Sequence, residues 1–397
     1  MRISRMLTAA GFAFSIVSTS AARAQSPALP ANTALDSLVA SRMAEAGIVG
    51  LGAALMVNRQ VVWMKGYGFA DWRRTRPFTP NTIMNVGSIA KPFTGVAMMR
   101  AVQEGTLSLD EDVNRYLPFR VVNPHHPNEK ITLRHLATHT SGITDRWEVY
   151  AGTYHFGGDS PEPLGRFLEQ YFTREGRHYS RDNFIDAKPG RRREYSNIGA
   201  GLAGYIVERA VGEPLNVYTR KHVFTPLRMT RTGWFLSEVD LANHSTLFVA
   251  QSGFAIPILH YGGTTYPDGG VRTSVADLSK FFIALLNGGE HQGARILDAR
   301  MTEEMLRFQF TDANRPENYA AEEGNSGLFW RTKYNGTRIG HGGNDPGIQT
   351  DMLSDVAKET GVILFTNTSL TGTEQRAYAA IFDALWKHAE SLRAGRS

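Results

Sequence analysis

The sequence predicts a mixed fold of the α/β class (α+β type). We expect an antiparallel sheet built from both chain ends and flanked by helices, plus a mainly helical lobe. Two observations predict this arrangement. Strand-like apolar runs occur near the start of the chain and again near its end, and the long segment between them has helical apolar spacing. The 397 residues, 42% of them hydrophobic, are enough to bury such a core.

The first 24 residues are expected to be a secretory signal peptide. Arg2 and Arg5 precede an uncharged stretch over 6–22, and Ala22-Arg23-Ala24 is typical of a cleavage site, which places cleavage after Ala24. We therefore expect a periplasmic or secreted protein without stable membrane insertion after cleavage. The alternative is an uncleaved membrane anchor, which the stretch disfavours because it is short and weakly apolar for a spanning helix.

Composition excludes several classes of function. The net charge is +5, and three of these positive charges lie in 1–24, which leaves +2 and no basis for a nucleic-acid partner. The absence of Cys excludes a disulfide framework and a cysteine nucleophile. The sequence contains no phosphate-binding loop and no dinucleotide fingerprint. We expect a small-molecule or peptide substrate and no cofactor.

The N-terminal part of the predicted sheet begins after a helix. Apolar residues at helical spacing predict that helix over about 34–46. Two apolar runs, over 49–57 and 61–70, flank the polar residues Asn58-Arg59-Gln60, which predicts a β-hairpin. The sheet lobe is therefore assigned to about 34–84, together with the C-terminal residues 290–397.

The middle of the chain, about 85–289, is assigned to the helical lobe. Helices are predicted over 91–103 and 199–211, and another follows the capping pair Thr273-Ser274 and runs to Leu286. Long loops are expected at 148–163 and 174–193. Strands are then predicted at 327–333, 337–340, 349–353 and 362–366, before a last helix over about 374–392. Residues 25–397 would form a single catalytic domain whose two lobes enclose a cleft.

Ser88-Ile89-Ala90-Lys91 is the central chemical signal. It precedes a helical pattern, and residues three apart share a helix face, so Lys91 is expected to reach the Ser88 hydroxyl. A serine becomes a nucleophile when a neighbouring base accepts its proton, and a buried lysine can do this. The alternative for so short a pattern is a helix-capping serine beside an exposed lysine.

Two further motifs lie downstream. Tyr195-Ser196-Asn197 is the only Tyr-x-Asn in the chain and precedes a glycine-rich helix start, where a phenol and an amide could project into a cleft. His341-Gly342-Gly343 follows a strand-like run, and its glycines would let a substrate lie against the strand edge. The alternatives are a core tyrosine with a turn-forming asparagine, and a turn with a surface histidine.

These three motifs, in this order, resemble those of the β-lactamase and penicillin-binding serine hydrolase family, especially its class C β-lactamase, DD-peptidase and esterase branch. The resemblance extends from about residue 35 to 390, and four further stretches support it: 66–71, 105–110, 131–142 and 269–274. It implies a β-lactamase/transpeptidase-like fold and a hydrolase that forms an acyl-enzyme and cleaves an amide, β-lactam or ester bond.

The resemblance also implies residue roles. Ser88 would be the nucleophile, Lys91 its proton acceptor and Tyr195 the general base and acid. The substrate would contact Asn197 and the third motif, His341, Gly342 and Gly343. The backbone N–H groups of Ser88 and Asn344 would form the oxyanion hole. β-Lactamases usually have Lys-Thr-Gly at the third motif, so a permanent cation and a hydroxyl are absent here, which disfavours efficient β-lactam hydrolysis.

Two alternatives belong to other classes. A non-catalytic exported protein on the same fold, either a penicillin-binding-type sensor or a cell-wall binding protein, is disfavoured by the complete set of motif residues. A metal-dependent hydrolase could use His135 and His139, which are four residues apart and could share a helix face. No Glu lies between them as in H-E-x-x-H, so no metal site is expected.

Overall fold

The computed structural model describes residues 33–395 except 252–253, 321–323 and 373. The predicted signal peptide and its cleavage site lie outside the described residues. Within the described part, none of the helices combines the length and apolar character needed to cross a bilayer.

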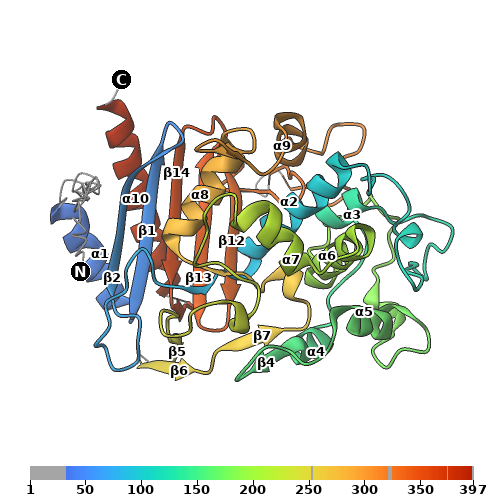
Figure 1. The fold of residues 1–397 in the computed structure, drawn as a ribbon, viewed down its shortest axis with the longest axis horizontal. Coiled ribbons are helices and arrows are strands. Elements are labelled where there is room, and N and C mark those ends of the chain that lie inside the picture. The colour runs from blue at the N-terminus through green and yellow to red at the C-terminus, as the bar shows by residue number, and fades with distance from the viewer. Residues whose placement is uncertain (1–32, 252–253, 321–323, 373, 396–397) are drawn as a thin grey trace, which may run out of the picture. The chain divides into compact units, whose positions relative to one another are not determined.

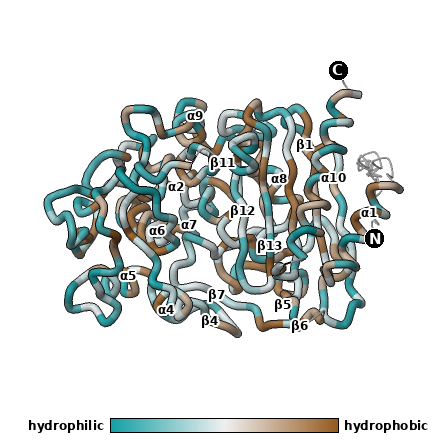
Figure 2. Tube along the Cα trace, turned by 180° about the vertical axis from the view of Figure 1, so that it is seen from behind, coloured by the Kyte–Doolittle hydropathy of each residue, from teal (hydrophilic) through white to brown (hydrophobic). Residues whose placement is uncertain are grey.

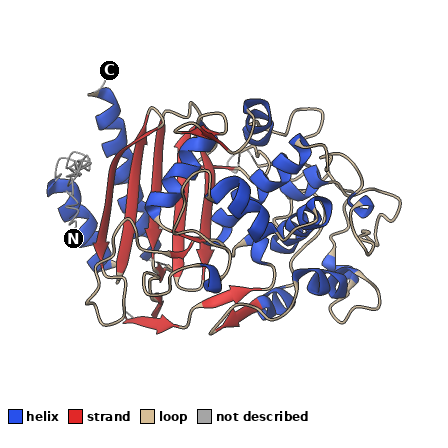
Figure 3. Cartoon of the chain, viewed as in Figure 1, coloured by secondary structure: helices blue, strands red, loops and turns tan. Residues whose placement is uncertain are grey.

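The central element is a six-stranded antiparallel sheet made from both ends of the chain, as the sequence predicted (Figures 1 and 3). Its strands, in spatial order, are β11 (Arg331–Lys333), β12 (Arg338–Asp345), β13 (Ile348–Asp355), β14 (Thr360–Thr366), β1 (Gly50–Val57) and β2 (Gln60–Gly68). The predicted hairpin is β1–β2. Strand β1 joins the two halves of the chain because its other edge pairs with β14, with Leu51 opposite Thr366.

Helices cover both faces of this sheet. Side chains alternate between the faces of a strand, and in β1 Leu51, Ala53 and Leu55 belong to the apolar cluster formed with α1 (Thr33–Glu45) and α10 (Glu374–Ala394). Ala54 and Met56 belong to the opposite cluster, which contains α8 (Val275–Leu286). Burial on both faces explains why all eight residues of β1 are buried and why the strand is almost wholly apolar.

The helical lobe packs beside the β12 end of the sheet (Figure 1). Its helices are α2 (Ala90–Gln103), α3 (Leu133–Ala137), α4 (Trp147–Tyr150), α5 (Leu164–Phe172), α6 (Asn197–Val211), α7 (Leu215–Thr219) and α9 (Ala299–Leu306). The lobe bounds thus differ from the predicted ones at two helices: α9 lies within 290–397 but packs against α2, and α8 lies within 85–289 but packs on the sheet. Most residues of α2 are buried, since it packs against α6, α7 and α9. Figure 2 shows hydrophobic segments in α8 and β1 and hydrophilic loops at the outer edge beyond α5.

The structure differs from the sequence prediction in several short strands. The region read as helical contains β5 (Leu247–Gln251), β6 (Phe254–Ile258) and β7 (Tyr261–Gly263). The segment expected to be a loop over 148–163 contains α4 and β4 (Tyr154–Phe156), which pairs with β7. Strand β11 begins at Arg331 rather than Gly327. β4 and β7 pair with each other across a long stretch of chain, and β5 pairs with the distant β15 (Thr368–Ser369) as well as with β6, so these short strands carry a weak local signal.

Candidate active site

Ser88 lies in a single 3₁₀ turn, Gly87–Ile89, immediately before α2. Gly87 has a φ of +53°, which favours glycine. A Cβ atom there would also lie 3.1 Å from Asp345 Oδ2 and 3.3 Å from the Cα of Gly343. The turn therefore rests directly against the end of β12, which brings the first and third motifs together.

Lys91 lies one helical turn after Ser88, and its side chain is completely buried. Its ammonium donates to Ser88 Oγ at 3.1 Å, to Asn197 Oδ1 at 2.7 Å and to the Asp268 carbonyl at 2.9 Å. An ammonium has three donors, so all three are used. The arrangement places Lys91 between the first two motifs and excludes the alternative of an exposed lysine.

Tyr195 lies just before α6, and its hydroxyl donates to Ser88 Oγ at 3.0 Å. Its ring centroid lies 4.9 Å from Lys91 Nζ and 5.0 Å from the guanidinium carbon of Arg331, which are cation–π distances. The ring also packs against the imidazole of His139, with the ring centroids 4.2 Å apart and the planes tilted by 32°. Tyr195 is thus held from three sides with its oxygen directed at Ser88.

The third motif is located inside a strand rather than after it. β12 continues through His341 to Asp345 and pairs with β13, with Gly343 opposite Thr350. A Cβ atom at Gly343 would lie 2.1 Å from the Val86 carbonyl oxygen, so only glycine allows this approach to the segment before Ser88. Asn344 is exposed at the end of β12, beside Ser88.

His341 is uncharged in this environment. Burial, and then the charges of Lys91 and Arg331, hold the pKa of His341 well below its ordinary value. Its Nδ1 bonds to the Gly342 carbonyl at 2.7 Å, so the single ring proton lies there. Nε2 is buried without a partner among the described residues and can only accept.

Two cavities meet at Ser88, and both are lined by Tyr195 and Asn344. The first, which we call the strand-side cavity, has a volume of about 310 Å³ and contains the third motif with Arg331 and Lys333. The second, which we call the aromatic cavity, has a volume of about 530 Å³ and contains Trp147, Tyr150, Tyr154, Asn197 and Asp345. A substrate centred on Ser88 can extend into both.

Comparison with known proteins identifies the family. The family model described as Beta-lactamase matches residues 35–385. This chain belongs to the beta-lactamase family. The chain is 26% identical over 260 residues to Protein flp of Staphylococcus aureus (strain MRSA252), which covers 64% of this chain and 48% of that protein. It thus spans about half the length of the curated relatives it matches.

Solved structures agree with the family assignment. The octameric penicillin-binding protein homologue from Pyrococcus abyssi has a TM-score of 0.70 and 26% identity, over 90% of this chain and 77% of that chain. The D-amino acid amidase from Ochrobactrum anthropi SV3 has a TM-score of 0.68 over 92% of this chain and 100% of that chain. Because the amidase is only 21% identical to this chain, its similarity concerns the fold alone. The predicted β-lactamase/transpeptidase-like fold is confirmed.

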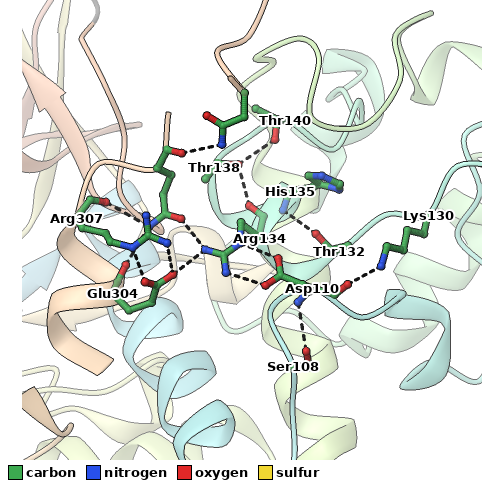
Figure 4. Close-up of polar contacts among 12 residues, drawn as sticks. Ser108, Asp110, Lys130, Thr132, Arg134, His135, Thr138, Thr140, Glu304 and Arg307 are labelled. Atoms are coloured by element: carbon green, nitrogen blue, oxygen red, sulfur yellow. Dashed lines mark hydrogen bonds and ion pairs between the residues drawn. The ribbon is translucent and has the colours of Figure 1, made fainter. Parts of the chain in front are cut away.

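The family stretch over 131–142 is held in place by Arg134. Figure 4 shows this side chain between Asp110 and Glu304, and it donates to Asp110 at 2.7 and 2.8 Å and to Glu304 at 2.7 Å. The side-chain hydrogen bond to Asp110 is the main cause that raises the pKa of Arg134. The network fixes α3 and the chain that follows it, which leads to the cleft.

His135 and His139 do not share a helix face, contrary to the alternative weighed from their spacing. Helix α3 ends at Ala137, and His139 has a φ of +58°. His139 Nδ1 instead accepts the backbone N–H of Ser196 at 3.2 Å, and the ring supports Tyr195. Across the described ranges, no group of three or more His, Asp or Glu side chains is arranged to hold a metal ion.

Asp145 is a site residue that the motifs did not indicate. Its carboxylate accepts hydrogen bonds from the Ser196 hydroxyl at 2.7 Å, the Asn197 N–H at 2.7 Å and the Ile198 N–H at 3.0 Å. These groups form the first turn of α6, whose positive end favours a carboxylate. Asp145 therefore positions the segment that carries Tyr195 and Asn197, although it lies about fifty residues upstream.

Arg331 and Lys333 were also missed. Both lie on β11, next to the third motif on β12, and line the strand-side cavity. Lys333 is paired with Asp351 at 2.6 Å, whereas Arg331 forms no ion pair with the described residues and its buried Nε has no partner among them. The cation absent from position 341 is thus present on the neighbouring strand.

Proposed function

We propose that this beta-lactamase-family chain is a serine hydrolase that forms an acyl-enzyme on Ser88 and hydrolyses an amide, β-lactam or ester bond. The observation that carries this proposal is the pair of hydrogen bonds to Ser88 Oγ, from Lys91 at 3.1 Å and Tyr195 at 3.0 Å. A serine hydroxyl becomes an effective nucleophile when a neighbouring group takes its proton. Lys91 and Tyr195 are the groups placed to do so.

The reaction would proceed in two steps. When one member of the Lys91–Tyr195 pair is unprotonated, Ser88 Oγ attacks the carbonyl carbon while its proton passes to that pair, and the backbone N–H groups of Ser88 and Asn344 stabilise the oxyanion. The bond to the departing nitrogen or oxygen breaks as Tyr195 returns the proton to it. Water then attacks the ester on Ser88, loses its proton to the same pair and releases the acid.

The two cavities would receive the two parts of the substrate. Asn197, the expected contact for a substrate amide, lines only the aromatic cavity, so we assign the acyl part to that side. The departing part would occupy the strand-side cavity, where Arg331 supports recognition of a carboxylate. A peptide or ester whose departing part ends in a carboxylate matches this distribution.

Covalent labelling tests the proposal. Intact-mass analysis after reaction with a fluorophosphonate or a labelled penicillin should show one adduct, which Ser88→Ala abolishes and the exposed Ser237→Ala retains. Nitrocefin, a D-alanyl-D-alanine peptide and p-nitrophenyl butyrate then distinguish the substrate classes. Labelling of Ser88 without turnover of any substrate would support the alternative of a penicillin-binding sensor or cell-wall binding protein. Absence of labelling would refute the acyl-enzyme.

We also propose that the protein is exported, with a signal peptide removed after Ala24. The basic residues Arg2 and Arg5, the uncharged stretch that follows and the Ala22-Arg23-Ala24 site support this. Expression of the whole chain in a Gram-negative host, followed by N-terminal sequencing of the periplasmic fraction, should give Gln25 as the first residue. An intact N-terminus retained in the membrane fraction would favour the anchor instead.

A further inference from the structure

The two cavities at Ser88 carry opposite charges. In the strand-side cavity Lys333 is neutralised by Asp351 and His341 is uncharged, which leaves the charge of Arg331. In the aromatic cavity Asp345 is the one charged side chain among the described residues that line it. The cleft is therefore polarised, with a cation on the side assigned to the departing group and an anion on the acyl side.

Asp345 presents an oxygen close to Ser88. Its Oδ1 accepts the Tyr154 hydroxyl at 2.6 Å, and no described residue donates a hydrogen bond to Oδ2. A Cβ atom on Gly87, the residue before Ser88, would lie 3.1 Å from Oδ2. Burial raises the pKa of this carboxyl to about 6, and it outweighs the Tyr154 hydrogen bond and the charge of Lys91, which lower the pKa. A cation bound next to Asp345 would offset the free-energy cost of burying its ionised carboxylate, and it would lie close to the carbonyl that Ser88 attacks.

The surrounding rings suit an ammonium group. Tyr150 and Tyr154 meet edge to face with ring centroids 5.7 Å apart. The ring of Trp147, which also lines the cavity, has its centroid 6.1 Å from that of Tyr150, and the residue is 66% exposed. Aromatic faces attract cations electrostatically, and they also pack against the apolar atoms of a substrate. A carboxylate with aromatic walls is a complementary environment for a primary ammonium.

We infer that the aromatic cavity is an ammonium-binding subsite, in which Asp345 and the rings of Tyr150 and Tyr154 bind a free amino group on the acyl part of the substrate. This rests on the proposed function, because it places the amino group relative to a carbonyl attacked by Ser88. The substrate class is thereby narrowed to amides, esters and short peptides of amino acids with an unblocked amino group. With Arg331 on the other side, a small zwitterionic peptide matches both charges.

A competing role for Asp345 is to balance the charge of Lys91. The hydrogen bonds of Lys91 go to Ser88, Asn197 and a backbone carbonyl, so none reaches a carboxylate oxygen. In that case, loss of the Asp345 charge would change the state of Lys91 and would weaken the binding of every ligand equally. An ammonium subsite instead predicts a loss confined to ligands with a free amine, and the two roles are separable by experiment.

The experiment measures protection of Ser88 against a fluorophosphonate by alaninamide and by N-acetylalaninamide, each as both enantiomers. At pH 7 the free amine is mainly cationic, and a carboxyl with a pKa of about 6 is mainly ionised. In the wild type, alaninamide should give half-maximal protection at a concentration about tenfold lower than N-acetylalaninamide does. Asp345→Asn should remove this difference, while Tyr154→Phe, which retains the carboxylate, should keep much of it.

Asp351→Asn is the matched control, because it removes a carboxylate from the other cavity and should leave the ratio between the two ligands unchanged. Equal protection by both ligands in the wild type, protection by neither, or an equal loss for both in Asp345→Asn would overturn the ammonium subsite. If Ser88 is not labelled at all, the proposed function fails. Calorimetric titration of the same two amides into wild type and Asp345→Asn then tests the subsite by itself.

Discussion

Replacing Asp145 by alanine should disrupt the site without touching a motif residue. The carboxylate receives three hydrogen bonds from the first turn of α6. Hydrogen bonds to a charged group are worth about 1.5–3 kcal/mol each, but these are non-additive and Asp145 is only half-buried, so we expect a loss of about 3 kcal/mol. With an unfolding entropy of about 0.8 kcal/mol/K for a chain of this length, Tm should fall by about 4 °C.

Asp145→Ala should also lower the reactivity of Ser88. Asn197 accepts a hydrogen bond from Lys91, and Tyr195 precedes the same turn, so a loosened α6 start displaces both from Ser88. The rate at which a fluorophosphonate labels Ser88 should fall at least about tenfold, or about 1.4 kcal/mol of transition-state stabilisation. Thermal unfolding and labelling at 25 °C, where the variant remains folded, measure the two effects separately.

Two variants make this prediction specific. Asp145→Asn keeps the oxygen that serves Ser196 and Ile198 and loses only the acceptor for the Asn197 N–H, so it should give an intermediate labelling rate. Asp159→Ala removes a carboxylate that accepts the N–H groups of Leu236 and Ser237 outside both cavities. It should lower Tm with unchanged labelling. A Tm loss of about 4 °C in Asp145→Ala with wild-type labelling would refute the positioning role.

Three further changes have defined outcomes. Gly343→Ala should abolish Ser88 labelling while the protein stays folded by circular dichroism, because the new Cβ would meet the Val86 carbonyl and push β12 from the Ser88 turn; retained labelling would contradict this. Burial raises the pKa of Asp268 to about 7, so the folded state keeps a proton that the unfolded state loses, and stability falls as pH rises from about 4 to about 7. The Tm of Asp268→Asn relative to wild type should therefore increase over that window and level off above it; a constant difference would argue against the shift. Arg331→Gln should weaken protection of Ser88 by peptides with a free C-terminal carboxylate about tenfold, and leave protection by their C-terminal amides unchanged.

The elements that local sequence predicts well are those with long apolar repeats. The helices at 33–45, 90–103 and 374–394, and the hairpin at 50–68, appear close to their expected bounds. Their apolar residues repeat at the period of the element and face one core. Strands β5 to β7 were predicted to be part of the helical region because they are short. The pairing partners of β7 and of the outer edge of β5, which are β4 and β15 (Thr368–Ser369), also lie far away in the chain.

The contact between Ser88 and Lys91 follows from local sequence, since a spacing of three residues at a helix start places both side chains on one face. The order of the motifs was likewise sufficient to indicate the family. Tertiary structure alone places Asp145 beneath α6, Arg331 beside His341 and Asp345 beneath the Ser88 turn. The contacts of Asp145 and Asp345 join residues separated by about 50 and about 260 positions, so no periodicity or local spacing encodes them. Arg331 and His341 are close in sequence, but they lie side by side only because β11 and β12 pair. The charge of each cavity, and hence the kind of substrate that it can accept, was decided by which distant side chains the fold brings together and which of them it leaves without a counter-ion.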